Sequence, residues 1–245
     1  MGRVVLLVAA LGLAPFASAD VIWSDDFGSY ADQAAMDAVY TQIYPAAPAL
    51  LDQTRGYDDL QSVHFGKPTA NSQVRMYKNL GLEAVGTDDM PLKFEFQVDI
   101  DALAWNTRQY IELRGYAGAG YGDGALEELL ALGFTSSGID TNKYNGRVLL
   151  GPEAGWFSFQ TDKITDWTKM TALIKTDTIE YYINDQLDTI KQRAPGYTFD
   201  CVVIGSGLSS AGADVWFDNL VIEVVPEPAT LALLMLGGLA LIRRR

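Results

Sequence analysis

The sequence predicts an all-β protein, an antiparallel β-sandwich with one short N-terminal helix. Short apolar segments recur along residues 20–225 and are separated by glycine, asparagine and aspartate residues, which favour turns. One of these segments, Phe94 to Ile100, alternates apolar and polar side chains, as a strand with one solvent-exposed face does. Residues 20–225 are enough for one large domain, and they contain no internal repeat that would indicate a solenoid or propeller.

Most of the predicted strands lie in the second half of this segment. The predicted strands are residues 94–100, 110–114, 147–150, 156–160, 170–175, 178–183, 186–191, 201–205 and 215–224. Asn184 and Asp185 tolerate positive φ angles and therefore predict a tight hairpin turn between two of these strands. The alanine-rich segment from Tyr30 to Tyr40 predicts the helix, with Ser29 as its N-cap. Residues 126–132 fit either a strand or a short helix.

The composition argues against several classes of function. A formal net charge of −13 makes nucleic acid an improbable partner. Cys201 is the one cysteine, so no intrachain disulfide can form, and its apolar strand context favours a buried structural thiol. Because His64 is the one histidine, a Ser-His-Asp catalytic site is nearly excluded.

The N-terminal segment has the three parts of a secretory signal peptide. Arg3 supplies a positive start, and an apolar stretch from Val4 to Ala14 follows. The small residues Ala17 and Ala19 then form a cleavage site before Asp20. We therefore assign residues 1–19 to an export signal and begin the domain at residue 20.

The C-terminal segment, residues 226–245, also has three parts. They are the triplet Pro226, Glu227 and Pro228, an apolar run over residues 229–242, and the terminal Arg243, Arg244 and Arg245. As a helix the run would span about 21 Å, less than the roughly 30 Å hydrocarbon core of a bilayer. We predict a marginal transmembrane segment with the arginines in the cytoplasm and the domain outside. A buried core helix is the alternative, but it would have to bury a chain end with three arginines.

The combination of export signal and tail resembles the PEP-CTERM proteins of Gram-negative bacteria. In that family the tail is thought to be recognised by an exosortase, a membrane transpeptidase-like protease, in bacteria that make exopolysaccharide. The resemblance therefore implies an inner-membrane intermediate with the domain outside the cytoplasm, followed by the cell surface or the extracellular matrix.

A second resemblance concerns the domain itself. An opening Asp25-Asp-Phe-Gly-Ser-Tyr30, a hairpin at the end of residues 167–190 and a closing strand over 215–222 resemble the concanavalin A-like, laminin-G-like jelly rolls. In such jelly rolls the first and last strands are commonly neighbours, which would bring Asp25 and Asp26 near Asp218 and Asn219. Calcium prefers oxygen ligands of this kind, so a structural calcium site is one hypothesis. The alternative is that Asp218 caps a turn.

Aromatic side chains on an exposed loop are typical of sugar binding, where they combine with a few polar groups. The glycine-rich segment from Gly115 to Gly124 carries Tyr116, Tyr121 and Asp123, and Trp105 upstream could join them. We predict a ligand-binding set from these four side chains. The alternative is that the tyrosines only cover the edge of the sandwich. The strand patterns place Trp156, Trp167 and Trp216 in the core.

Catalysis needs a different set of residues. Glycoside hydrolases on this kind of sandwich use two carboxylates that face one cleft. Glu95, Asp99 and Asp101 lie on one face by strand alternation, but their spacing departs from the Glu-x-Asp-x-x-Glu pattern of the family 16 enzymes. We interpret them as a solvent-exposed face and predict a non-catalytic domain that binds glycan or exopolysaccharide. A polysaccharide-cleaving enzyme and a protein-binding, adhesive surface protein are the alternatives.

Overall fold

The protein is a sandwich of two antiparallel β-sheets, as the sequence predicts. The computed structural model describes residues 19–66, 73–136, 139–206 and 212–225. The helix is α1 (Gln33–Asp37). The strands are β1 (Asp20–Asp25), β2 (Thr41–Gln42), β3 (Leu50–Asp52), β4 (Ser62–Phe65), β5 (Val74–Ala84), β6 (Leu92–Ile100), β7 (Gln109–Tyr116), β8 (Leu126–Phe134), β9 (Lys143–Val148), β10 (Gly155–Asp162), β11 (Thr168–Ile174), β12 (Thr178–Ile183), β13 (Gln186–Gln192), β14 (Phe199–Ser206) and β15 (Val215–Val224).

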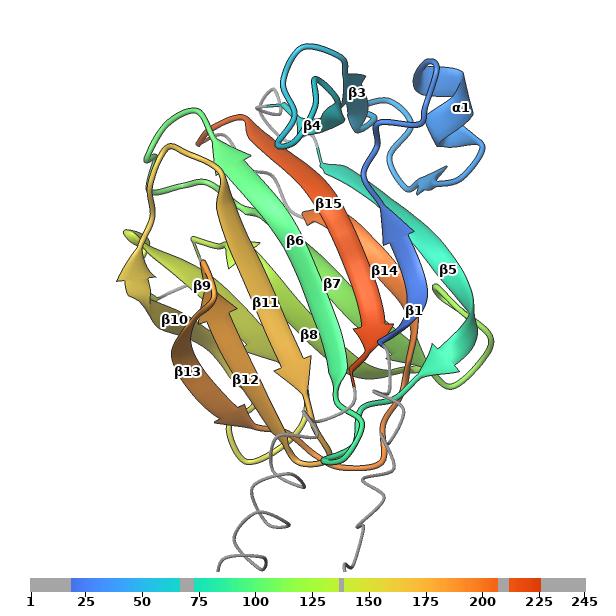
Figure 1. Ribbon diagram of the computed structural model, residues 1–245, viewed down its shortest axis with the longest axis vertical. Helices are drawn as coiled ribbons and strands as arrows, with labels where there is room; N and C mark the ends of the chain where they lie inside the picture. The colour runs from blue at the N-terminus through green and yellow to red at the C-terminus, as the bar shows by residue number, and fades with distance from the viewer. Residues whose placement is uncertain (1–18, 67–72, 137–138, 207–211, 226–245) are drawn as a thin grey trace, which may run out of the picture.

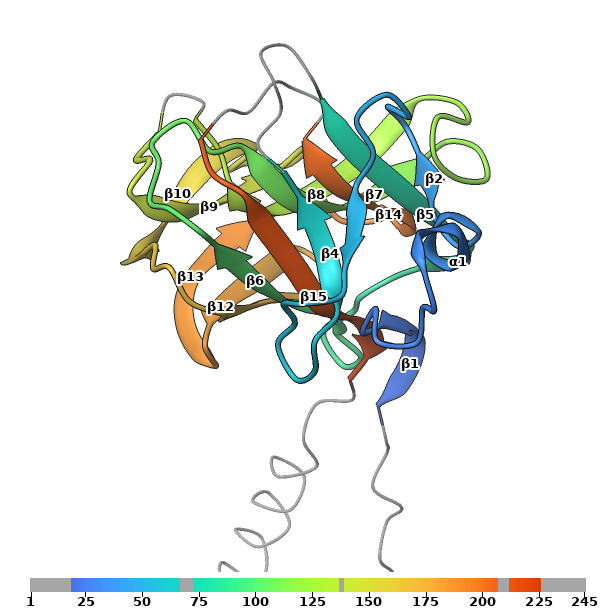
Figure 2. The ribbon, with the colours of Figure 1, turned by 90° about the horizontal axis from the view of Figure 1, so that it is seen from above.

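The two sheets differ in their strand order. Sheet A runs β13-β12-β11-β6-β15-β4-β3, and β1 also pairs with β15. Sheet B runs β10-β9-β8-β7-β14-β5-β2. Figure 1 shows sheet A in front of sheet B, and Figure 2 shows sheet B above sheet A after a turn of 90°. The first and last strands are therefore neighbours, as the jelly-roll resemblance implies.

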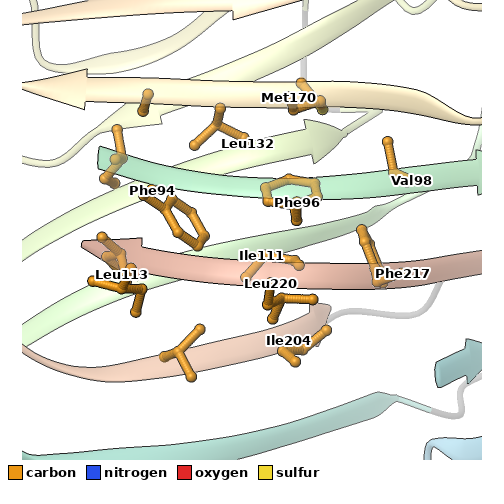
Figure 3. Packing of buried hydrophobic residues seen from close by; sticks show 14 of the residues in the cluster. Phe94, Phe96, Val98, Ile111, Leu113, Leu132, Met170, Ile204, Phe217 and Leu220 are labelled. Carbon is orange, nitrogen blue, oxygen red and sulfur yellow. The ribbon is translucent and has the colours of Figure 1, made fainter. Parts of the chain in front are cut away.

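The hydrophobic core lies between the inner faces of the sheets (Figure 3). Phe94 and Phe96 of β6 and Phe217 of β15 extend from sheet A, and all three are fully buried. Ile111 and Leu113 of β7 meet them from sheet B. Because successive side chains of a strand point to opposite faces, the intervening residues of each strand form the outer face of its sheet.

The predicted hairpin is confirmed. Asn184 and Asp185 connect β12 to β13 with φ angles of 49° and 65°, the left-handed pair that a two-residue type I′ turn requires. The Asn184 side chain also accepts a hydrogen bond from the backbone N–H of Lys169 at 2.9 Å, which ties the turn to β11.

The helix is shorter than predicted, and its N-cap is Asp32 rather than Ser29. The Asp32 Oδ1 atom accepts a hydrogen bond from the backbone N–H of Ala35 at 2.9 Å, so it satisfies an N–H group that the first helical turn leaves unpaired. Tyr30, whose hydroxyl donates to Asp25, lies before the helix. Residues 126–132, which fitted either element, belong to strand β8.

Both ends of the domain lie at the same end of the sandwich, because Asp20 at the start of β1 pairs with Val224 near the end of β15. The predicted cleavage residue Ala17 and the whole tail, residues 226–245, lie outside the described residues. Among the residues that are described, no helix has the length and apolar character needed to cross a bilayer.

Candidate functional site

The outer face of sheet B carries a continuous row of side chains that crosses six strands. Successive cross-strand partners in this row are Tyr77, Val203, Glu112, Ala131, Arg147 and Trp156. Neighbouring strands are about 4.8 Å apart, so the row extends roughly 24 Å across the sheet. Small side chains, Val203 and Ala131, lie on either side of Glu112. Aromatic residues occupy the two ends of the row.

Glu112 lies on β7, the central strand of sheet B, and forms ion pairs with two arginines. Its Oε2 atom is 2.6 Å from Nη2 of Arg114 and 3.4 Å from Nη2 of Arg75. Arg114 also donates from Nη1 to the hydroxyl of Tyr116 at 2.9 Å. Charge-assisted hydrogen bonds of this kind fix the orientation of the guanidinium groups. Although burial lowers it, the pKa of Arg114 lies above its ordinary value because the charge of Glu112 and the bond to Tyr116 outweigh the burial.

An aromatic cluster covers one end of the row. The ring of Tyr121 stacks on Tyr77 with centroids 4.4 Å apart and meets Tyr116 edge-on at 5.7 Å. The guanidinium of Arg114 lies 5.7 Å from the centroid of the same Tyr121 ring. All three tyrosines are partly exposed, so they offer aromatic surface to a ligand.

The loop after β7 places Tyr121 by folding back toward β5. The Asn79 Oδ1 atom accepts a hydrogen bond from the backbone N–H of Tyr121 at 3.0 Å, and Asp123 accepts one from Ala119 at 2.9 Å. Gly120 has a φ of 124°, and a Cβ atom there would lie 2.7 Å from the Asn79 side chain. The glycine-rich sequence thus permits the close approach that brings Tyr121 onto Tyr77.

Trp156 and Arg147 form the other end of the row. The Trp156 ring packs edge-on against Tyr110 at 5.2 Å, and the guanidinium of Arg147 lies 5.7 Å from the Trp156 centroid. Tyr110 belongs to a small apolar cluster with Leu129 and Ala131 on this outer face. A partly exposed indole beside an apolar strip and a cation can contact both the apolar face and the polar groups of a sugar.

The four side chains predicted to bind a ligand are not all brought together. Tyr116 and Tyr121 are in contact, and Asp123 orders the loop that carries Tyr121. Trp105 is 69% exposed but lies in the loop before β7, whereas the other three follow or end that strand. An eight-residue strand is about 27 Å long, so Trp105 is at the opposite end of the sheet.

Several residues of this face were not predicted to bind a ligand. Tyr77, Arg75, Glu112 and Arg114 come from strand interiors, and Trp156 lies on the outer face rather than in the core. One signal could have found part of this set. Alternate residues of β7, from Tyr110 to Tyr116, combine aromatic and charged side chains, and strand alternation places them on one face.

The carboxylates considered for catalysis lie elsewhere, on or near the outer face of sheet A, and each has a partner there. Glu95 accepts a hydrogen bond from Thr171 at 2.9 Å, and Asp99 is bound by Arg55. Asp101 lies beyond the end of β6 and accepts the backbone N–H of Asp214 at 2.9 Å. Glu95 lines the cavity described below, whereas Asp99 and Asp101 do not, so the three side chains do not face one another in one cleft.

Of the other two tryptophans predicted for the core, Trp216 is buried but not between the two sheets, and Trp167 is partly exposed. Trp216 is nearly buried on the outer face of sheet A, where its ring stacks on His64 at 4.8 Å and Arg55 lies 3.8 Å from its centroid. Trp167 meets the exposed Tyr57 edge-on at 6.0 Å. The long loop before β4 thus covers part of sheet A.

The predicted calcium ligands surround a second, acidic region. A cavity of about 660 Å³ opens beside β1 and β15, and its lining includes Asp25, Asp26, Asp58 and Asn219. Asp25 is engaged internally, because it accepts hydrogen bonds from the hydroxyls of Tyr30 and Tyr40, the latter at 2.9 Å.

Asp218, the other predicted ligand, accepts the backbone N–H groups of Tyr57 and Asn219, each at 2.7 Å. Burial raises the pKa of Asp218 to about 6, and the negative charges of Asp59 and Asp26 add to this effect. Within the described part of the chain, no three His, Cys, Asp or Glu side chains form a group that could hold a metal ion. The calcium site stays a prediction.

Comparison with known sequences identifies the end of the chain. Residues 224–245 match the PEP-CTERM protein-sorting motif. The chain ends in this sorting signal. The motif implies export, processing by an exosortase in the membrane and sorting to the cell surface, as the sequence predicts. No curated protein matches the chain.

Comparison with solved structures identifies the fold. The globular domain of T. cruzi calreticulin superimposes with a TM-score of 0.58 and 12% identity, covering 86% of this chain and 90% of that one. The cellulose-induced protein Cip1 gives 0.56 and 13%, covering 82% and 96%. A Bacillus licheniformis β-glucanase gives 0.50 and 12%, covering 84% and 98%. At such low identity these likenesses establish the jelly-roll, concanavalin A-like fold alone.

Proposed function

We propose that this exported protein is a non-catalytic, glycan-binding module whose binding surface is the outer face of sheet B. The observation that carries the proposal is the row of side chains across this face, with stacked tyrosines at one end and a tryptophan at the other. Aromatic rings combined with a few fixed polar groups are a common way to hold a sugar chain. The likeness to a protein named β-glucanase supports a polysaccharide ligand.

The arrangement of carboxylates supports binding over cleavage. Hydrolysis of a glycosidic bond needs one carboxyl group to protonate the leaving oxygen and a second to act as nucleophile or base. Glu112 is 1% exposed and bound by two arginines, and Asp200 is 7% exposed and accepts the backbone N–H of Tyr116. Glu112 is therefore not available to meet a substrate on this face, and one oxygen of Asp200 is already held by the backbone.

The sorting tail completes the proposal. We infer that the tail holds the exported protein at the inner membrane until an exosortase processes it, after which the sandwich serves at the cell surface or in an exopolysaccharide matrix. Mass spectrometry of the protein from its native cells would detect cleavage of the tail, because the mass of the mature protein would lack the residues of the apolar run. Retention of the full mass would contradict processing.

A binding assay on a glycan array tests the proposed function, with Tyr121→Ala as the informative variant. Loss of the Tyr121 ring removes a stacking surface and should weaken binding about five-fold, or about 1 kcal/mol. Tyr57→Ala is the matched control, since Tyr57 is 45% exposed and contacts Trp167 near sheet A. Equal losses from both variants, or no binding by the wild type, would contradict the proposal. Release of reducing ends from a bound glycan would instead support the enzyme alternative.

A further inference from the structure

The charges on the outer face of sheet B are unlike those of the rest of the chain. The formal net charge of the protein is −13, and several cations on the outer face of sheet A are paired with carboxylates. Arg55 pairs with Asp99, Lys93 with Glu223 and Lys169 with Asp185. On the outer face of sheet B, by contrast, Arg75 and Arg114 share the single carboxylate of Glu112. The Glu112 carboxylate is therefore the common ion-pair partner of two guanidinium groups there.

Arg147 adds a further positive charge to the same face. It lies two strands from Glu112 in the cross-strand row, with Ala131 between them. It forms no ion pair with the described residues, and its one contact of note is the Trp156 ring. Its guanidinium is partly exposed and therefore free to meet an anionic group of a ligand that lies against the indole.

Two carboxylates near the loop end of β7 are engaged in holding the backbone. Asp123 accepts the N–H of Ala119 within the loop, and Asp200 accepts the N–H of Tyr116. Both lie at the loop end of β7, whereas Arg147 and Trp156 lie at the opposite end of the cross-strand row. The Arg147 end of the row is thus positive without a competing acidic group among the described residues of the row.

We propose that the glycan bound on this face is an acidic polysaccharide, with carboxylate or sulfate groups that meet Arg147 while its sugar rings lie on Trp156 and the tyrosine cluster. This inference rests on the proposed function, because it assigns a chemical class to the ligand of the same surface. A guanidinium presents paired N–H donors that match the geometry of a carboxylate or a sulfate, and a neutral sugar hydroxyl would not use that charge.

The experiment compares three polysaccharides with the whole protein by titration calorimetry. They are polygalacturonate, which carries carboxylates, dextran sulfate, which carries sulfates, and uncharged dextran. The wild type should bind at least one acidic polymer about ten-fold more tightly than dextran. Arg147→Gln should remove most of this preference, and Arg147→Lys should restore part of it because the charge returns. Lys169→Gln, which removes a cation from the outer face of sheet A, should leave it unchanged.

The outcomes separate this inference from the proposed function. Equal binding of acidic and neutral polymers, weakened in both cases by Tyr121→Ala, would overturn the acidic preference and leave glycan binding intact. Binding of none of the polymers, together with a blank glycan array, would overturn both. An equal effect of Arg147→Gln and Lys169→Gln would also overturn the inference, because it would show a response to overall charge. Melting temperatures of the variants confirm that each is folded.

Discussion

At the scale of single residues, Glu112 is the side chain on which the geometry of the candidate site depends. It is almost completely buried, and it orients Arg75 and Arg114 on the outer face of sheet B. A buried carboxylate with two guanidinium partners differs from the exposed pairs elsewhere, because removal of one charge leaves the others without compensation in a poorly solvated place.

Replacement of Glu112 tests this difference. Glu112→Ala should lower the free energy of unfolding by about 3–5 kcal/mol, because it leaves two buried guanidinium groups unpaired. Glu153→Ala breaks an exposed pair with Lys191 and should cost less than about 1 kcal/mol. Denaturant unfolding of both variants measures the two values. Similar small losses would mean that Glu112 does not organise the arginines.

Asp218 predicts how stability depends on pH. Its pKa in the folded protein is about 6, above the ordinary value of 3.8, because of burial and the charges of Asp59 and Asp26. Between these two values the folded protein keeps a proton that the unfolded chain has lost. The stabilisation from Asp218 is therefore present below about pH 4 and is lost as the pH rises through about 6.

Melting curves measured from pH 4 to pH 7 check this sign. The wild type should lose stability over this interval, and Asp218→Asn should lose less, because it carries no titrating group at that position. Parallel pH curves for the two proteins would refute the assigned pKa.

Calcium at pH 7 should raise the melting temperature of the wild type more than that of Asp218→Asn if a cation binds beside Asp218. If calcium does not change the melting temperature of chelator-treated wild-type protein, the calcium prediction is refuted.

At the scale of elements, the hairpin between β12 and β13 is determined by local sequence. Both turn residues, Asn184 and Asp185, adopt positive φ angles. Asp185→Val places a β-branched side chain in the left-handed region and should lower the free energy of unfolding by about 1–2 kcal/mol. Thr189→Val introduces the same residue within β13 and should have little effect. Thermal denaturation compares the two, and equal stabilities would show that the turn does not constrain the hairpin.

Elements with strong local signals were predicted well, and those that depend on tertiary context were not. Strands β12 and β15 have the predicted bounds, because alternating side chains and turn residues mark both. Residues 129–132 are all apolar because this part of β8 is buried on both faces, so periodicity could not separate strand from helix over residues 126–132. The N-cap is Asp32 rather than Ser29, because the Asp32 side chain accepts the N–H of Ala35 in the first helical turn.

The candidate site was predictable only where it lies in one segment of sequence. Tyr116 and Tyr121 share the glycine-rich loop and its flank, so composition indicated them. Tyr77 and Trp156 are on strands that the sheet order places beside β14 and β9, and no local pattern reports that order. For the same reason, Trp105 appeared close to the loop in sequence although a whole strand separates them in space.

At the scale of the whole molecule, the two ends of the described domain lie next to each other. The domain begins at Asp20 and its last strand ends at Val224, and these two residues are paired. The sorting motif starts at residue 224, so the sorting signal joins the sandwich at that same end. The outer face of sheet B extends along the side of the domain (Figures 1 and 2).

The most direct test of glycan binding on this face is hydroxyl-radical footprinting of the whole protein with and without a saturating polysaccharide. Mass spectrometry reports the labelling of individual aromatic side chains. The account predicts that the glycan protects Tyr77, Tyr121 and Trp156, while Tyr57 and Trp105, which are exposed elsewhere, are labelled as before. Protection of Tyr57 or Trp105 with unchanged labelling of the sheet B residues would contradict it.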